Sequence, residues 1–215
     1  FSIMGKIKQG ILGAVSGKVG SVVGSSWKGI ATLRSLAASV ANPKTAPQVA
    51  ARTKFTAGVK FASAILAEVV KPLWDRFAQK QSGYNAFISR NYNAFDSSGV
   101  LDPTLLVTSQ GKIASTPIVS AIADISGDYV SASWLNDAGI GFKLATDVAY
   151  ITVYDTLADK AYGYSNPTIT RASLLVGISI PDINFGSVYE VYLSFRREDG
   201  TMVSDSSYLT ATVQP

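Results

Sequence analysis

The chain has 215 residues and a net charge of +4, and it contains neither cysteine nor histidine. A chain of this length buries roughly 70% of its unfolded surface, so it needs no disulfide or metal to hold a core. The missing residue types exclude disulfide scaffolds, thiol nucleophiles, imidazole-based triads and the usual zinc and iron–sulfur sites. We therefore expect no cofactor, no metal and no enzymatic activity.

The charges are unevenly divided along the chain. Residues 1–67 hold nine lysines and arginines and no acid, whereas residues 68–215 hold ten cations and fifteen acids, a net charge of −5. A basic segment joined to an acidic one docks on a neighbouring acidic surface, binds nucleic-acid phosphates, or serves solubility. The residues expected to form such an interaction arm are Lys6, Lys8, Lys18, Trp27, Lys28, Arg34, Lys44 and Arg52.

Residues 1–45 are rich in glycine, serine and small apolar residues, a composition that disfavours helix. We expect an extended, basic, glycine-rich arm. Residues 22–27 and 30–34 have strand propensity, and Lys28-Gly29 between them predicts a β-hairpin. The glycines match neither a P-loop nor a dinucleotide fingerprint. No signal peptide is expected, and no stretch reaches the roughly 20 apolar residues of a membrane span.

Residues 46–97 are predicted to be helical. Thr45 suits the cap of a helix with Pro47 in its first turn, and apolar residues then recur at helical spacing. Pro72 falls inside this pattern and should kink or break the helix near Val70-Lys71. A second helix fits residues 82–95, whose aromatic side chains we interpret as helix packing rather than base stacking.

Residues 98–117 are expected to form a linker, and short alternating strands follow it. The predicted strands span residues 129–134, 148–154, 188–195 and 208–213, with a hairpin turn at Asp199-Gly200. Strands at this spacing predict that residues 118–215 form an antiparallel β-sandwich that folds alone, with Trp134 in its core.

The strand pattern resembles that of a fibronectin type III or immunoglobulin-like module. Trp134 lies on an early strand, Tyr189, Val191 and Leu193 alternate on a later one, and an Asp-Gly turn follows. The resemblance covers less than half of the chain and implies a fold whose members usually bind or space other parts. The fold class we predict is α+β: an extended arm, a short helical region and a C-terminal antiparallel β-sandwich.

Several motifs in residues 4–55 together resemble an uncharacterised family of small proteins. These motifs are Met4-Gly5-Lys6, Gly17-Lys18-Val19-Gly20, Trp27-Lys28-Gly29, Arg34 and Asn42-Pro43-Lys44-Thr45, followed by Gln48 and Arg52. The family carries a domain-of-unknown-function label and occurs in Bacteroidota and in their phages and prophages. The resemblance therefore implies no catalytic residues, and it implies a part in a virion or a surface assembly.

The aspartates are scattered singly, mostly beside glycine, serine, asparagine or proline, where this residue serves turns. Asp124 with Asp128, and Asp155 with Asp159, lack the dense oxygen pattern of a calcium loop. We interpret all of these acids as turn residues. A carboxylate pair assembled in space, as in glycosidases, stays open as an alternative.

The sequence thus predicts a non-enzymatic structural or assembly protein, a subunit of a phage virion or cell-surface particle that self-associates through its N-terminal arm. Its expected partners are copies of itself or other structural subunits. The main alternative is nucleic-acid binding through residues 5–60, and a more distant one is a carbohydrate-binding or hydrolytic module. The expected location is a virion or extracellular assembly, or otherwise the cytoplasm, without a membrane span.

Overall fold

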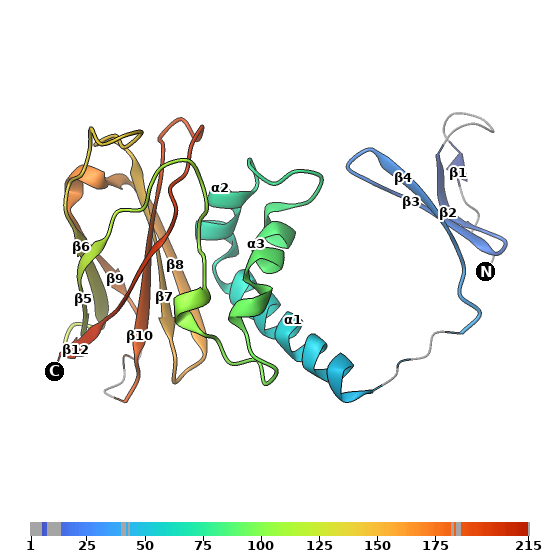
Figure 1. Cartoon of the computed structure of the whole chain (residues 1–215), viewed down its shortest axis with the longest axis horizontal. Helices are drawn as coiled ribbons and strands as arrows, with labels where there is room; N and C mark the ends of the chain where they lie inside the picture. Colours follow the sequence, from blue (N-terminus) through green and yellow to red (C-terminus); the bar gives the residue numbers. More distant parts are fainter. Residues whose placement is uncertain are drawn as a thin grey trace. The chain divides into compact units, whose positions relative to one another are not determined.

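The computed structural model describes residues 6–7, 14–39, 42, 44–181, 183 and 186–214. The chain divides into two compact units, Phe1–Thr45 and Ala46–Pro215 (Figure 1). Over the described residues it combines three α-helices with three four-stranded sheets, in which antiparallel pairs predominate. The chain is therefore α+β, as predicted.

The first unit is a four-stranded antiparallel sheet with the order β1-β2-β3-β4. Its strands are β1 (Lys6–Ile7), β2 (Val15–Val19), β3 (Val22–Trp27) and β4 (Ile30–Ser35). The predicted hairpin is confirmed: Lys28 and Gly29 join β3 to β4 with φ angles of 47° and 83°. Two consecutive left-handed residues form the type of tight turn that matches the twist of a hairpin. The segment is therefore a folded sheet rather than only an extended arm.

The second unit begins with the helices. They are α1 (Ala46–Ala64), a π-helical turn (Leu66–Val70), α2 (Lys71–Trp74) and α3 (Gly83–Asn91). Pro72 lies in the first turn of α2, directly after the π-helical turn. The predicted irregularity is thus present as a π-helical turn rather than as a break, because Val70 and Lys71 keep right-handed helical angles. The Ser82 hydroxyl caps α3 by accepting a hydrogen bond from the Asn85 amide at 3.2 Å.

Two sheets follow the helices, with the strand orders β11-β10-β7-β8 and β12-β5-β6-β9. Their strands are β5 (Ile118–Asp124), β6 (Tyr129–Trp134), β7 (Val148–Asp155), β8 (Lys160–Thr170), β9 (Leu175–Ser179), β10 (Tyr189–Arg196), β11 (Ser207–Thr210) and β12 (Thr212–Gln214). The single strand predicted over residues 208–213 is in fact two. Ala211 is buried between them, and β12 continues into the other sheet, where it pairs parallel with β5.

The second unit has three layers, with the sheet of β7 and β10 between the helices and the other sheet (Figure 1). Along β7, Ala149, Ile151 and Val153 pack into the core between the two sheets, while Tyr150 and Tyr154 pack into the core against the helices. Both faces of β7 are therefore buried. Trp134 is buried in the core between the sheets, as predicted.

Residues 98–117, expected to be a linker, pack closely onto the rest of the second unit. Leu106, Thr108 and Ile113 are buried, and Ile113 bridges to Ser204 near the end of the chain. The reason is that the helices share a hydrophobic core with β7 and β10, so the connection between helices and strands runs over a packed surface. The helical region, this connection and the strands accordingly belong to one compact unit.

Candidate functional site

The N-terminal sheet has a cationic face. Side chains alternate between the two faces of a strand, and paired residues on neighbouring strands share a face. Val23 pairs with both Lys18 and Arg34. Four residues further along β3, Trp27 pairs with Ile30 of β4, and an even number of residues keeps both pairs on one face. Lys18, Arg34, Trp27 and Ile30 therefore lie on the same face, which we call the cationic face.

The opposite face of this sheet is apolar. Val19 pairs with Val22, and Leu33 follows on β4, with all three side chains exposed. Gly24 lies on this face beneath β2, where an added Cβ would come within 2.0 Å of the Val15 carbonyl oxygen. Glycine is required at this position because no side chain fits under β2.

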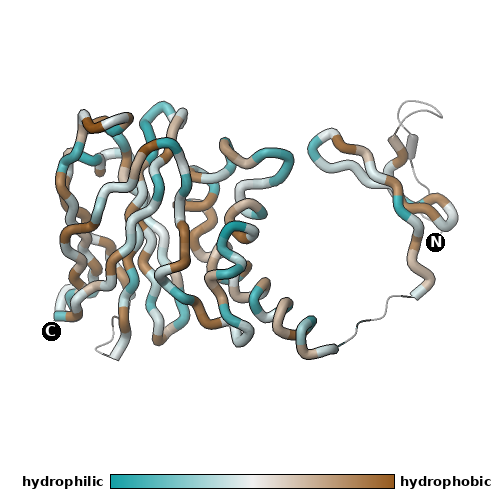
Figure 2. The backbone as a smooth tube through the Cα atoms, in the orientation of Figure 1, coloured by the Kyte–Doolittle hydropathy of each residue, from teal (hydrophilic) through white to brown (hydrophobic). Residues whose placement is uncertain are grey.

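The sheet has almost no core of its own. Of its described residues only Gly24 is buried, whereas Trp27 is 59% and Leu33 65% exposed. Figure 2 shows hydrophobic positions along these strands as well as in the second unit. A concentration of exposed apolar side chains on so small a unit is typical of an interaction surface.

The other residues expected in the interaction arm lie in different places. Lys28 occupies the first left-handed position of the β3–β4 turn. Lys6 is opposite Ser16 in the register of β1 and β2, Lys44 is exposed, and Arg52 is exposed on α1 in the second unit. Lys8 lies outside the described residues. The structure therefore unites Lys18, Trp27 and Arg34 on one face and separates Arg52 from them.

The second unit contains a pocket between α1 and the hairpin of β7 and β8. Its volume is about 150 Å³. The lining combines aromatic rings and small side chains with a charged rim, and we call it the aromatic pocket. Its walls are Ala57, Phe61, Ala64, Phe95, Tyr154, Ala161 and Tyr162, and its rim is Lys60, Asp159 and Lys160.

The rim of the aromatic pocket is organised around Asp159. Lys60 Nζ lies 2.5 Å from Asp159 Oδ2, and the Tyr154 hydroxyl donates a hydrogen bond to Asp159 Oδ1 at 2.9 Å. Burial raises the pKa of Tyr154 well above its ordinary value, and the hydrogen bond to Asp159 raises it further. Tyr154 therefore stays protonated and donates, and the carboxylate of Asp159 is held at the mouth of the pocket.

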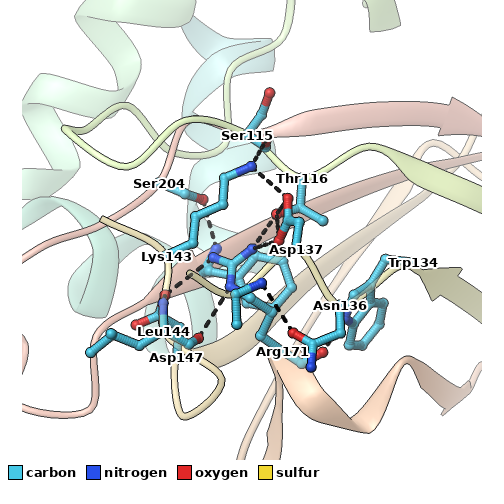
Figure 3. A network of polar contacts seen from close by, with 12 residues as sticks. Ser115, Thr116, Trp134, Asn136, Asp137, Lys143, Leu144, Asp147, Arg171 and Ser204 are labelled. Carbon is cyan, nitrogen blue, oxygen red and sulfur yellow. Dashed lines mark hydrogen bonds and ion pairs between the residues drawn. The ribbon is translucent and has the colours of Figure 1, made fainter. Parts of the chain in front are cut away.

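The second unit also contains a buried ion network around Arg171 (Figure 3). Arg171 is fully buried, and its guanidinium donates to Asp137 Oδ1 at 2.6 Å and to Asp147 Oδ2 at 3.2 Å. The guanidinium also lies 4.0 Å from the centre of the Phe195 ring. Lys143 Nζ donates to Asp137 Oδ2 at 2.5 Å. These contacts hold the loop between β6 and β7 against β10.

The electrostatics of this network are those of a structural ion cluster. Burial by itself raises the pKa of Asp137, but hydrogen bonds from Lys143, Arg171 and Thr116, together with the charge of Arg171, hold it below its ordinary value. The acids here are more than the turn residues that the sequence predicts, whereas Asp96 and Asp199 do bond local backbone amides as expected. No local sequence pattern indicates this ion cluster, because Arg171 lies far along the chain from Asp137 and Asp147.

Among the residues that the structure describes, no three aspartates or glutamates lie together as a metal ion would require. In the same part of the chain, no helix is both long and apolar enough to cross a membrane.

Comparison with known families identifies the family to which the chain belongs. A family model described as a family of unknown function, DUF6266, matches residues 13–210. The chain belongs to this family. The resemblance to an uncharacterised family predicted from residues 4–55 is thereby confirmed, and the DUF6266 match extends through both compact units. A search of curated proteins finds no match.

Proposed function

We propose that this DUF6266 chain is a non-enzymatic structural subunit of a phage virion or a cell-surface particle, and that it self-associates through its N-terminal sheet. The observation that carries the proposal is the exposure of large apolar side chains on a sheet without a core. They are Val19, Val22, Trp27, Ile30 and Leu33, and Leu36 follows directly after β4.

Burial of these side chains is a sufficient driving force for assembly. Fully burying a valine, leucine or isoleucine side chain contributes about 1.5–3 kcal/mol, so a few of them support a stable contact. The strand β4 lies at the edge of its sheet, and all six of its residues are exposed. An edge strand of this kind adds readily to the sheet of a partner.

Charge supports association between copies. The first unit, residues 1–45, carries six cations and no acid, whereas residues 46–215 carry thirteen cations and fifteen acids. The basic sheet of one copy and the acidic second unit of another therefore attract each other, and salt weakens that attraction. We propose that the paired sheets of the second unit are a fibronectin type III- or immunoglobulin-like module that acts as a spacer.

The test compares the full chain with residues 46–215 by light scattering over a range of protein concentrations. We expect the full chain to form oligomers that salt loosens, and residues 46–215 to be monomeric. Replacing Leu33 by serine should weaken the oligomers, while Leu135→Ser, at a similarly exposed position of the second unit (65% and 70% exposed), serves as the control. A monomeric full chain, or oligomers that persist without residues 1–45, contradicts the proposal.

The alternative function, nucleic-acid binding, is favoured by the cationic face. Lys18 and Arg34 flank Val23 there, and Trp27 offers a ring on which a base stacks. Titration with single-stranded DNA, followed by Trp27 fluorescence, separates the two functions. We expect weak binding that falls steeply with salt. Tight, sequence-specific binding at physiological salt reverses the order of the two proposals.

A further inference from the structure

We infer that Trp27 of one copy inserts into the aromatic pocket of another copy. This inference rests on the proposed self-association and names the contact that produces it. The partner is thus a second copy of this chain, and the recognised group is its indole ring.

Trp27 is suited to be the inserted group. It is the last residue of β3, next to the tight turn, so the hairpin presents it at its tip. Its side chain is 59% exposed, whereas Trp74 and Trp134 are 9% and 2% exposed. Exposed tryptophan is unfavourable in water and is the residue type most often found at the energetic centre of an interface.

The size and lining of the aromatic pocket suit a ring. The volume of about 150 Å³ is close to that of an engineered apolar cavity, about 150 Å³, that binds benzene, so it accommodates the six-membered ring of an indole. The Phe61 ring contacts the rings of Phe95 and Tyr154, whose centres are 6.4 and 5.6 Å away. Aromatic rings at such distances and inclined to one another attract an inserted ring through edge-to-face contacts.

The polar group of the indole ring also finds a partner at the rim of the aromatic pocket. An indole has a single polar group, an N–H that only donates, so a buried tryptophan needs an acceptor. Asp159 places a carboxylate at the rim of the pocket, fixed there by the Tyr154 hydroxyl. Its ion pair with Lys60 is exposed, at 63% and 62% for the two side chains, so that pair contributes little and leaves Asp159 able to accept.

The contact joins different surfaces of the two copies. Trp27 belongs to the first unit and the aromatic pocket to the second, so each copy offers one inserted group and one pocket. Two copies can therefore exchange sheets reciprocally, or many copies can connect head to tail into a ring or filament. Either arrangement is that of an assembling subunit.

The first experiment follows acrylamide quenching of tryptophan fluorescence in the full chain. Because Trp74 and Trp134 are buried, most of the quenchable emission comes from Trp27. We expect the quenchable fraction to fall as protein concentration rises, in step with oligomer formation measured by light scattering. Quenching that stays at the monomer level while oligomers form overturns the inference.

The second experiment changes the two sides of the contact separately. Trp27→Ala removes the ring, and Ala64→Leu narrows the pocket at an exposed helix position where leucine is well tolerated. Each should raise the dissociation constant about thirtyfold or more. Ala51→Leu, an exposed alanine of α1 away from the pocket, is the matched control and should leave the constant unchanged.

Mixing the variants is the decisive measurement. A Trp27→Ala copy keeps its pocket, and an Ala64→Leu copy keeps its tryptophan, so a mixture retains one complete contact. We expect each variant alone to be monomeric and the mixture to form a 1:1 heterodimer. A mixture that remains monomeric overturns the inference.

Two matched substitutions test the contribution of Asp159 to the contact. Asp159 and Asp128 both occupy left-handed positions of β-hairpin turns, with φ of 50° and 51°, so asparagine fits either. Asp159→Asn should weaken assembly, and Asp128→Asn should not. Equal effects of the two changes contradict the role of Asp159.

The outcomes separate this inference from the proposed function. If residues 46–215 are monomeric and Trp27→Ala assembles like the unchanged chain, the sheet mediates assembly by another contact and only the inference fails. A full chain that is monomeric at every concentration overturns both.

Discussion

Arg171 should be the most sensitive single position in the second unit, and Arg171→Met tests this. Methionine keeps much of the packing volume but removes every hydrogen bond that the guanidinium donates. Asp147, which is fully buried, then loses its nearest cation, and Arg197 Nε is 3.9 Å from its other carboxylate oxygen. Removing one partner of a buried ion pair costs about 3–5 kcal/mol.

The expected loss is therefore about 4 kcal/mol, to which the lost contact between Arg171 and the Phe195 ring contributes. In a unit of this size 1 kcal/mol corresponds to about 2–4 °C, so Tm should fall by about 10 °C. Thermal unfolding followed by circular dichroism on residues 46–215 measures it. Lys60→Met, which removes an exposed ion pair, is the control and should change stability by less than about 1 kcal/mol.

A second substitution, Asp147→Asn, tests whether Arg171 compensates the buried charge, because its effect on stability should change sign when Arg171 is replaced. In the unchanged protein Asp147→Asn should lower stability, because it removes the charge that Arg171 binds. In the Arg171→Met background the same change should raise stability, because it removes a buried charge that has lost its nearest cation and keeps only the more distant Arg197. A Tm of Arg171→Met near that of the unchanged protein, or the same sign for Asp147→Asn in both backgrounds, refutes the argument.

Three further predictions follow from the second unit. Trp134→Ala should cost roughly 3–5 kcal/mol in urea unfolding through loss of core packing, and Trp134→Phe less, since it mainly removes the 2.8 Å hydrogen bond to the Arg171 carbonyl oxygen. The folded-state pKa of Asp137 is lowered, so its contribution is present above the unfolded pKa of about 4 and is lost as pH falls through the folded value. Unfolding free energies measured down to about pH 2 should therefore decline less steeply in Asp137→Asn. The expectation from sequence that residues 118–215 fold alone is revised, because the helices cover one face of the sheet of β7 and β10. Residues 118–215 alone should therefore bind a hydrophobic dye and aggregate, whereas residues 46–215 should unfold cooperatively.

The predictions that succeeded rest on residues close together in sequence. Lys28-Gly29 determines the β3–β4 hairpin because its two residues adopt left-handed angles that suit the turn. Pro72, which has no backbone N–H to donate, lies where the π-helical turn changes to α2, and Ser82 caps α3. The strand over residues 129–134 follows from its alternation and matches β6. Each of these signals is complete within one local segment.

The composition and local pattern of the sequence determined the α+β class, the hairpin, the helices and the burial of Trp134. Only the tertiary structure decided that the helices cover β7, that the last predicted strand divides between two sheets, and that Asp137 and Asp147 surround Arg171. It also assembled the aromatic pocket from Phe61, Phe95 and Tyr154, which lie far apart in the chain. The physical reason is that local propensity acts over one turn or strand, whereas burial and charge pairing depend on which distant surfaces meet, and no local pattern encodes that meeting.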